Sequence, residues 1–222
     1  MARDECPQGC PRRGDLSTGG ASGSGIMCSR EALPMGSVAG GPAGKIVLTY
    51  EDYLRLPADG KRYELLEGEV YMAPAPSPRH QDVSRNLGWI LDGYVRAHRV
   101  GKVYYAPIDV VLSRSTVVQP DLIFISSDRL DIVGRHNVAG PPDLVVEILS
   151  PATVQYDRTV KPQVYARYGV PHLWLLDPED QVLEAYELVG GAYVLKERLS
   201  QGIFRPSLLP GLEIRLDEVW EE

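Results

Sequence analysis

Beyond residue 28 this sequence contains no cysteine, and nowhere does it contain a long apolar run. Its three cysteines are Cys6, Cys10 and Cys28, without the second close pair that a structural zinc site needs. No stretch approaches the roughly 18 apolar residues that span a bilayer, and the N-terminus has no apolar segment typical of a signal peptide. These absences predict a protein of the reducing cytoplasm with no membrane association.

Positive charge is also in short supply. The 222 residues include 23 Lys and Arg against 30 Asp and Glu, a net charge of −7, which argues against a protein that coats nucleic acid non-specifically. The imbalance is local, since residues 177–222 hold eleven acids and four bases, whereas residues 79–102 hold five bases and two acids. The basic segment suits a face that binds a polyanion, and it equally suits a solvated helix.

Regular hydrophobic periodicity is missing from residues 1–44, which are rich in Gly, Ser, Pro and Ala. Such a segment buries too little apolar surface to offset the entropy lost on ordering, so we expect a disordered leader. Residues 45–222 are long enough for one domain with a full core, and the hydrophobic content of 44% is ordinary for a globular protein.

The first half of this domain carries clear start and turn signals. Thr49 and Asp52 resemble a capping box, which predicts a short helix that ends before Pro57. Residues 62–66 and 69–72 predict two strands joined by a tight turn at Glu67-Gly68. Ser77-Pro78 then starts the longest helix, which we expect Gly101 to close.

The second half alternates strands and helices. We expect a strand over residues 102–112 with Pro107 at a bulge or edge, buried strands over 118–125 and 144–150, and a loop over 126–142. A helix over 157–168 with Pro162 in its first turn, a strand over 172–176 and a hairpin that turns at Gly190-Gly191 follow. The pattern predicts an α/β or α+β domain with a central mixed sheet flanked by helices.

Two carboxylates interrupt the buried strands. Asp121 follows Pro120 at the start of one apolar run, and Glu147 lies between Val146 and Ile148 in the other. An ionised carboxylate inside a buried strand costs several kcal/mol unless a cation or donors compensate it. Mg²⁺ prefers oxygen ligands and takes one or two carboxylates, to which the carbonyl of Ile148 adds a third oxygen. The pair therefore predicts a divalent-cation site for phosphoryl chemistry, with Lys161 on the next helix as charge stabiliser.

Each of these residues also has an interpretation other than a metal site. Asp121 after a proline is compatible with a simple cap, and Glu147 with an arginine pair. Glu64 is a candidate third ligand or a partner of Lys161. His80, in the first turn of the long helix, suits a contact to phosphate or water and equally a capping role. Asp109 lies either near the site or toward solvent.

The order and spacing of several motifs resemble the Uma2 family, also called domain of unknown function 820, over about residues 46–216. The motifs are Thr49–Leu54, Tyr63–Glu69, Val118–Asp121, Val146–Ser150, Lys161 with Tyr165, and Gly169–Pro178. This bacterial family is placed among restriction-endonuclease-like folds of the PD-(D/E)XK type. Two positions depart from the family pattern: Glu67 stands where relatives more often have Asp, and His172 where they tend to have Glu.

The resemblance implies roles for individual residues. Pro120-Asp121 fills the PD position and Glu147 the D/E position, whereas Leu149 occupies the usual place of the lysine, which Lys161 matches on the following helix. Glu64 and His80 match the acidic residue of the first hairpin and the histidine that opens the long helix. The expected protein is an endonuclease that uses Mg²⁺ or Mn²⁺ held by Asp121 and Glu147, acts on nucleic acid, in the first place DNA, and forms a homodimer.

Two alternatives remain open at this stage. One is a nucleic-acid-binding or regulatory protein that keeps the nuclease fold with little activity, which the net acidity favours. The other is a homodimeric interaction module built on an exposed sheet edge, in which the two carboxylates point away from each other.

Overall fold

The computed structural model describes residues 46–222. The leader predicted over residues 1–44, with its three cysteines, lies outside the described residues. The described chain contains four α-helices and a short 3₁₀-helix: α1 (Tyr50–Tyr53), α2 (Pro78–His98), η1 (Ser127–Ile132), α3 (Val154–Arg167) and α4 (Leu216–Val219). No helix within residues 46–222 is both long and apolar enough to cross a membrane.

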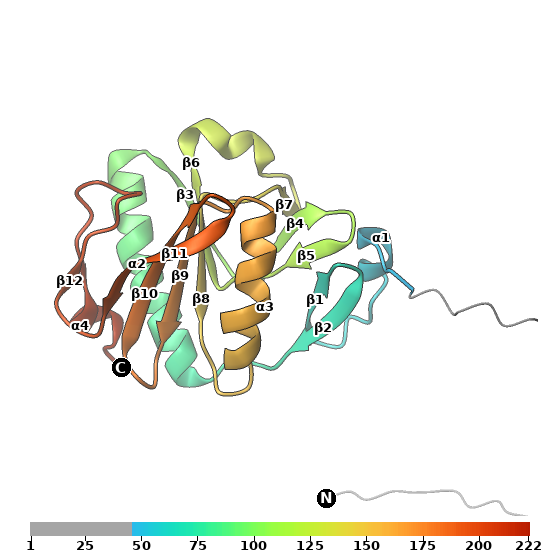
Figure 1. Ribbon diagram of the computed structural model, residues 1–222, viewed down its shortest axis with the longest axis horizontal. Helices are drawn as coiled ribbons and strands as arrows, with labels where there is room; N and C mark the ends of the chain where they lie inside the picture. The colour runs from blue at the N-terminus through green and yellow to red at the C-terminus, as the bar shows by residue number, and fades with distance from the viewer. Residues whose placement is uncertain (1–45) are drawn as a thin grey trace, which may run out of the picture. The chain divides into compact units, whose positions relative to one another are not determined.

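The larger sheet has six strands and is mixed (Figure 1). Its spatial order is β11 (Ala192–Leu199), β10 (Val182–Val189), β9 (His172–Asp177), β8 (Leu144–Ile148), β6 (Leu122–Ser126) and β3 (Gly101–Tyr105). Strands β8 and β9 run parallel, and the other neighbours are antiparallel. The predicted fold class, a mixed sheet flanked by helices, is therefore confirmed.

A second sheet of five strands was not predicted. Its order is β2 (Glu69–Ala73), β1 (Arg62–Leu66), β5 (Thr116–Val118), β4 (Asp109–Ser113) and β7 (Asn137–Ala139). Strands β12 (Ile203–Phe204) and β13 (Ile214–Arg215) form a separate pair. Strands β5 and β7 have three residues each, too few to show a period of two in the sequence. Pairing defines them: β5 pairs with β4 and β1, and β7 with β4.

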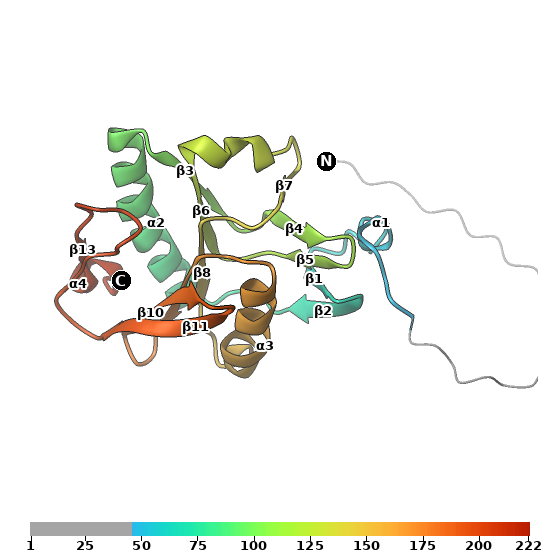
Figure 2. The same ribbon diagram turned by 45° about the horizontal axis from the view of Figure 1, so that its top comes forward.

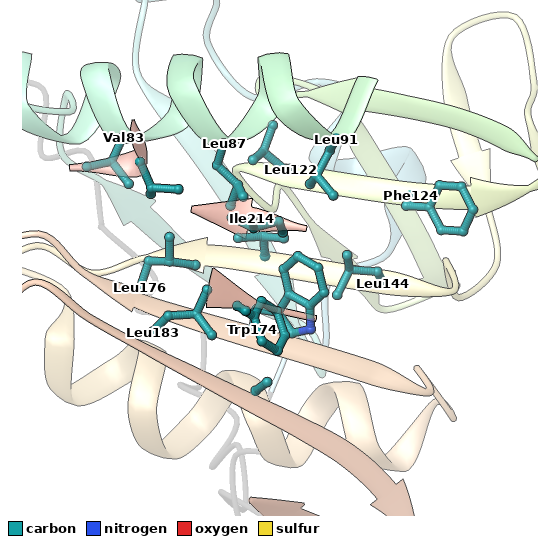
Figure 3. Close-up of a cluster of buried hydrophobic side chains, with 14 of the residues drawn as sticks. Val83, Leu87, Leu91, Leu122, Phe124, Leu144, Trp174, Leu176, Leu183 and Ile214 are labelled. Carbon is teal, nitrogen blue, oxygen red and sulfur yellow. The ribbon is translucent and has the colours of Figure 1, made fainter. Parts of the chain in front are cut away.

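The two faces of the six-stranded sheet carry different helices. Figures 1 and 2 show α2 on one side of the sheet and α3 on the other. Because side chains alternate along a strand, each strand supplies both faces. The α2 face includes Leu122, Phe124, Leu144, Val146, Trp174 and Leu176, which pack against Val83, Leu87 and Leu91 of the helix (Figure 3). The α3 face includes Ile123, Ile125, Val145, Leu173 and Leu175, together with Val164 and Tyr165 of the helix.

Local signals placed the first elements correctly. The capping box at Thr49 is present and starts α1. Glu67 and Gly68 both have positive φ, 50° and 84°, as a two-residue hairpin turn of type I′ requires. The Ser77 side chain accepts a hydrogen bond from the backbone N–H of His80, and Pro78 begins α2.

Other boundaries differ from the prediction. Arg99, with φ 58°, caps α2 in the left-handed region, so Gly101 opens β3 rather than closing the helix. The strand expected over residues 102–112 is two strands in different sheets, β3 and β4. The expected loop after Ser126 contains η1 and β7. Helix α3 begins at Val154, which places Pro162 inside the helix rather than in its first turn.

Two glycines give a matched test of this packing. A Cβ on Gly101 would overlap the backbone carbonyl oxygen of Ile125 and lie 2.7 Å from Cε2 of Phe124, whereas a Cβ on Gly93 would meet nothing within 4 Å. We expect Gly101→Ala to lower the free energy of unfolding by about 1–3 kcal/mol through overpacking. We expect Gly93→Ala to raise it by about 0.5–1 kcal/mol, because alanine is the better helix former. Urea unfolding of both variants measures the difference, and equal midpoints would contradict the close approach at Gly101.

Candidate active site

Asp121 lies where the chain leaves the five-stranded sheet and enters the six-stranded one. It follows β5 and directly precedes β6, whose first residue, Leu122, pairs with Val146 of β8. One step further along this antiparallel register brings Asp121 opposite Glu147, and opposite residues project from the same face. The backbone N–H of Ile148 donates to Oδ2 of Asp121 at 2.9 Å. The two predicted ligands therefore share the α3 face of neighbouring strands.

A histidine and an arginine hold Asp121, which is 6% exposed. The Nε2 atom of His80 lies 3.2 Å from Oδ2, and Nη1 of Arg62 lies 3.5 Å from Oδ1. Burial alone would raise the pKa of Asp121. The hydrogen bonds from His80 and the Ile148 N–H, with the nearby charges of His80 and Lys161, hold it below its ordinary value. Asp121 is thus kept as a carboxylate.

Both side chains that donate hydrogen bonds to Glu147 belong to α3. Nζ of Lys161 donates to Oε2 at 3.0 Å, and the hydroxyl of Tyr165 donates to Oε1. The carboxyl group is buried, 2% exposed. Burial, reinforced by the negative charges of Asp157, Asp121 and Glu64, raises the pKa of Glu147 to about 8 in spite of Lys161.

Lys161 lies at the centre of an acidic cluster. Besides Glu147, its Nζ is 3.3 Å from Asp157 Oδ1, one turn earlier on α3, and 3.4 Å from Glu64 Oε1 on β1. Burial would lower its pKa, but the charges of Glu147, Glu64 and Asp157 raise it well above the ordinary value. Lys161 is therefore a fixed cation that joins α3 to strands of both sheets.

In this cluster the acidic side chains outnumber the permanent cations. Glu64, Asp121, Glu147 and Asp157 face Arg62 and Lys161, and His80 lies beside Asp121. Buried like charges repel strongly because the surroundings screen them poorly. A cation bound beside Asp121 and Glu147 would reduce this repulsion.

A small cavity of about 40 Å³ lies among these residues. Its polar lining consists of Arg62, His80, Asp121, Glu147, Asp157 and Lys161, with Ser150 and Thr153 at the start of α3. A water molecule occupies about 30 Å³ in the liquid, so the cavity has room for a cation or a water near the carboxylates. Glu64 is absent from the lining, but its Oε1 lies 3.4 Å from Nζ of Lys161, which does line the cavity.

The donor set fits Mg²⁺ or Mn²⁺ as a two-carboxylate site. Within residues 46–222 no three His, Cys, Asp or Glu side chains are grouped as a metal site. Mg²⁺ usually binds one or two carboxylates and keeps waters or substrate phosphate as its other ligands. Asp121 and Glu147, which line the same cavity, supply such a pair.

Comparison with known proteins gives the chain its family. The family model Uma2, described as "Putative restriction endonuclease", matches residues 50–217. The chain belongs to the Uma2 family. Among solved structures, the chain is similar to one described as "a putative nuclease belonging to DUF820" from Anabaena variabilis. The TM-score is 0.65 at 20% identity, over 78% of this chain and 97% of the other. No protein with a curated description matches.

The structure of this Uma2 protein brings together the five residues predicted for its site. Asp121, Glu147, Lys161 and His80 line the cavity, and Glu64 adjoins it through Lys161. Asp109 is elsewhere: its Oδ1 accepts hydrogen bonds from the Tyr53 hydroxyl and the Gln119 amide, both at 2.8 Å.

Three further residues of the Uma2 site were not assigned to it from the sequence. Asp157 precedes Lys161 by four positions, the spacing at which helical side chains meet. Arg62 precedes Glu64 by two positions, the spacing of one strand face. Tyr165, which was matched only as part of a family motif, is buried and donates a hydrogen bond to Glu147.

Helix α3 of the Uma2 domain is anchored to the sheet by a second, separate charge cluster. Glu184 on β10 accepts hydrogen bonds from Arg158 of α3 at 2.6 Å, Tyr186 at 3.0 Å and Arg198 at 3.1 Å. Burial acts to raise the pKa of Glu184, but the hydrogen bonds from Arg158 and Tyr186, with the arginine charges, hold it below its ordinary value. Since Arg158 is three residues before Lys161, this cluster helps to fix the direction of Lys161.

Proposed function

We propose that this Uma2 protein is a metal-dependent nuclease that hydrolyses internal phosphodiester bonds of nucleic acid. The observation that carries the proposal is the single cavity lined by Asp121, Glu147 and Lys161, with Lys161 bonded to Glu147 at 3.0 Å. The family description, restriction endonuclease, and the nuclease-like fold support it. DNA as substrate and a cytoplasmic homodimer as the working form are part of the same proposal.

Each residue has a distinct part in this reaction. Asp121 and Glu147 would hold Mg²⁺ or Mn²⁺, which when bound supplies Lewis acidity toward a phosphoryl oxygen. His80, Arg62 and the Ile148 N–H fix the orientation of Asp121. Lys161, held as a cation by three carboxylates, stabilises negative charge that develops on the phosphate. Tyr165 fixes the rotamer of Glu147 from the opposite oxygen.

The two alternatives differ in what they require of these residues. An interaction module requires carboxylates that point apart, yet Asp121 and Glu147 line one cavity. A binding protein without activity is compatible with the same geometry, and its specific support is that both carboxylates already have cationic partners. Measured activity distinguishes this alternative from the nuclease.

The nuclease proposal is tested by adding and removing the metal. We expect purified protein to cut plasmid or single-stranded DNA with Mg²⁺ or Mn²⁺, and the cleavage to fall to background when EDTA is added and to return with excess Mn²⁺. Gel electrophoresis of the products measures the rate and shows whether cuts are internal. Cleavage that persists in EDTA would exclude metal dependence, and no cleavage with any metal or nucleic acid would favour the binding protein.

A further inference from the structure

A second and larger cavity adjoins the candidate active site. It has a volume of about 370 Å³, within the range of small-molecule sites. The two cavities share one wall, formed by Arg62 and residues 73–76. Gly60, Lys61 and Met72 line only the larger one. The larger cavity therefore lies beside the place where the proposed function puts a scissile phosphate.

The lining combines apolar walls with two cations. Met72, 58% exposed, and the prolines Pro74 and Pro76 present apolar surface. Ligand cavities usually combine apolar walls with a few polar or charged groups. The side chains of Met72, Pro74 and Pro76 give the flat face of a nucleobase an apolar surface to pack against.

Both cations of this cavity, Lys61 and Arg62, can still bind a phosphate. Nη2 of Arg62 donates a hydrogen bond to the carbonyl oxygen of Gln119 at 2.5 Å, and Nη1 donates to Oδ1 of Asp121 at 3.5 Å. A guanidinium has five N–H donors, so Arg62 retains donors for a phosphate oxygen. Lys61 is 3.1 Å from Asp59 in an exposed pair, and exposed pairs of this kind contribute at most about 1 kcal/mol. Lys61 can therefore exchange Asp59 for a phosphate at little cost.

We propose that the cavity formed by Lys61, Arg62, Met72 and residues 73–76 binds one unpaired nucleotide next to the scissile phosphate. In a duplex the base is stacked and paired, so only an unpaired or extruded base enters such a cavity. The substrate is then single-stranded nucleic acid, or a duplex with an unpaired nucleotide at the cut. This inference rests on the proposed function, because it places the reacting phosphate at Asp121 and Glu147.

Binding without catalysis tests the inference. Fluorescence anisotropy in EDTA compares a labelled single strand, the same sequence as a duplex, and the duplex with one unpaired nucleotide. We expect the single strand to bind about 5- to 150-fold more tightly than the duplex, since packing of one base contributes about 1–3 kcal/mol. An abasic nucleotide at one position of the single strand should remove most of this preference. Equal affinity for single strand and duplex would overturn the inference.

Two exposed side chains allow matched variants outside the catalytic residues. Met72→Ala and Lys61→Ala should each weaken single-strand binding several-fold and leave duplex binding unchanged. Leu54→Ala and Lys196→Ala, exposed residues outside both cavities and outside the basic segment 79–102, should have no effect. Single-strand binding unchanged in Met72→Ala and Lys61→Ala would also overturn the inference.

The same measurements separate this inference from the proposed nuclease function. Metal-dependent cleavage of duplex and single strand at equal rates, without a binding preference, would leave the nuclease standing and remove the nucleotide cavity. A clear binding preference for unpaired nucleotides, without cleavage under any metal, would support the nucleotide cavity and remove the nuclease proposal.

Discussion

Asp121→Asn is expected to lower the rate of phosphodiester cleavage by about a thousandfold or more while the fold is kept. Asparagine has the same shape and still accepts the hydrogen bond from the Ile148 N–H, which Asp121 receives at 2.9 Å. The variant lacks the charge that would hold the cation, and cation stabilisation of phosphoryl chemistry is worth several kcal/mol. A loss of about 4 kcal/mol corresponds to a thousandfold lower rate. Single-turnover cleavage at saturating Mn²⁺ measures it.

A matched control comes from a carboxylate elsewhere in the sheet. Asp143 accepts hydrogen bonds from the Ser126 N–H and hydroxyl and pairs with Arg129, but lies outside the candidate site. Asp143→Asn should cost stability and leave the cleavage rate per folded molecule unchanged. The assignment of Asp121 fails if Asp121→Asn cuts as fast as the wild type, or if Asp143→Asn loses as much activity.

Lys161→Met is expected to lower the free energy of unfolding by about 3–5 kcal/mol, because it leaves buried carboxylates without their cation. Three of them, Glu147, Asp157 and Glu64, lie within 3.4 Å of Nζ. Methionine fills a similar volume, so the loss is electrostatic rather than a cavity effect. Urea unfolding at neutral pH measures it, and Lys196→Met, at an exposed lysine, should change the stability by less than about 0.5 kcal/mol.

A double variant shows whether charge is the cause. Removing the ionisable carboxyl group of Glu147 as well, in Lys161→Met/Glu147→Gln, should restore part of the lost stability, giving a coupling energy of about 1–3 kcal/mol. Added Mg²⁺ should raise the melting temperature of Lys161→Met more than that of the wild type, because the cation replaces the missing positive charge. A stability loss below about 1 kcal/mol, or additive effects, would show that the carboxylates are not held by Lys161.

The two carboxylates show where local sequence is sufficient. Glu147 stands inside a run of buried apolar residues and Asp121 at the head of another, so their cost in a buried strand is visible without a structure. Their neighbouring strands, β6 and β8, were predicted as buried and lie side by side in the six-stranded sheet. The family and the fold class were likewise contained in the order of motifs along the chain.

The second sheet shows where local sequence is not sufficient. Residues 118–125 appear as one apolar run, yet Val118 ends a strand of one sheet and Leu122 begins a strand of the other. The single strand expected over 102–112 divides between the same two sheets. Val118 pairs with nearby Val110, whereas Leu122 pairs with distant Val146. The period of two within a strand carries no information about which sheet it joins.

For this protein, the sequence by itself determined the residue types of the candidate site, the family and the alternation that separates the α2 and α3 faces of the sheet. Only the tertiary structure decided that Lys161 turns toward Glu147, that Arg62, Asp157 and Tyr165 belong to the same cluster, and that a larger cavity adjoins it. The physical reason is that helical periodicity gives the relative faces of residues on α3, but not the rotation of the helix against the sheet. That rotation is set by long-range contacts, among them Arg158 with Glu184 on β10.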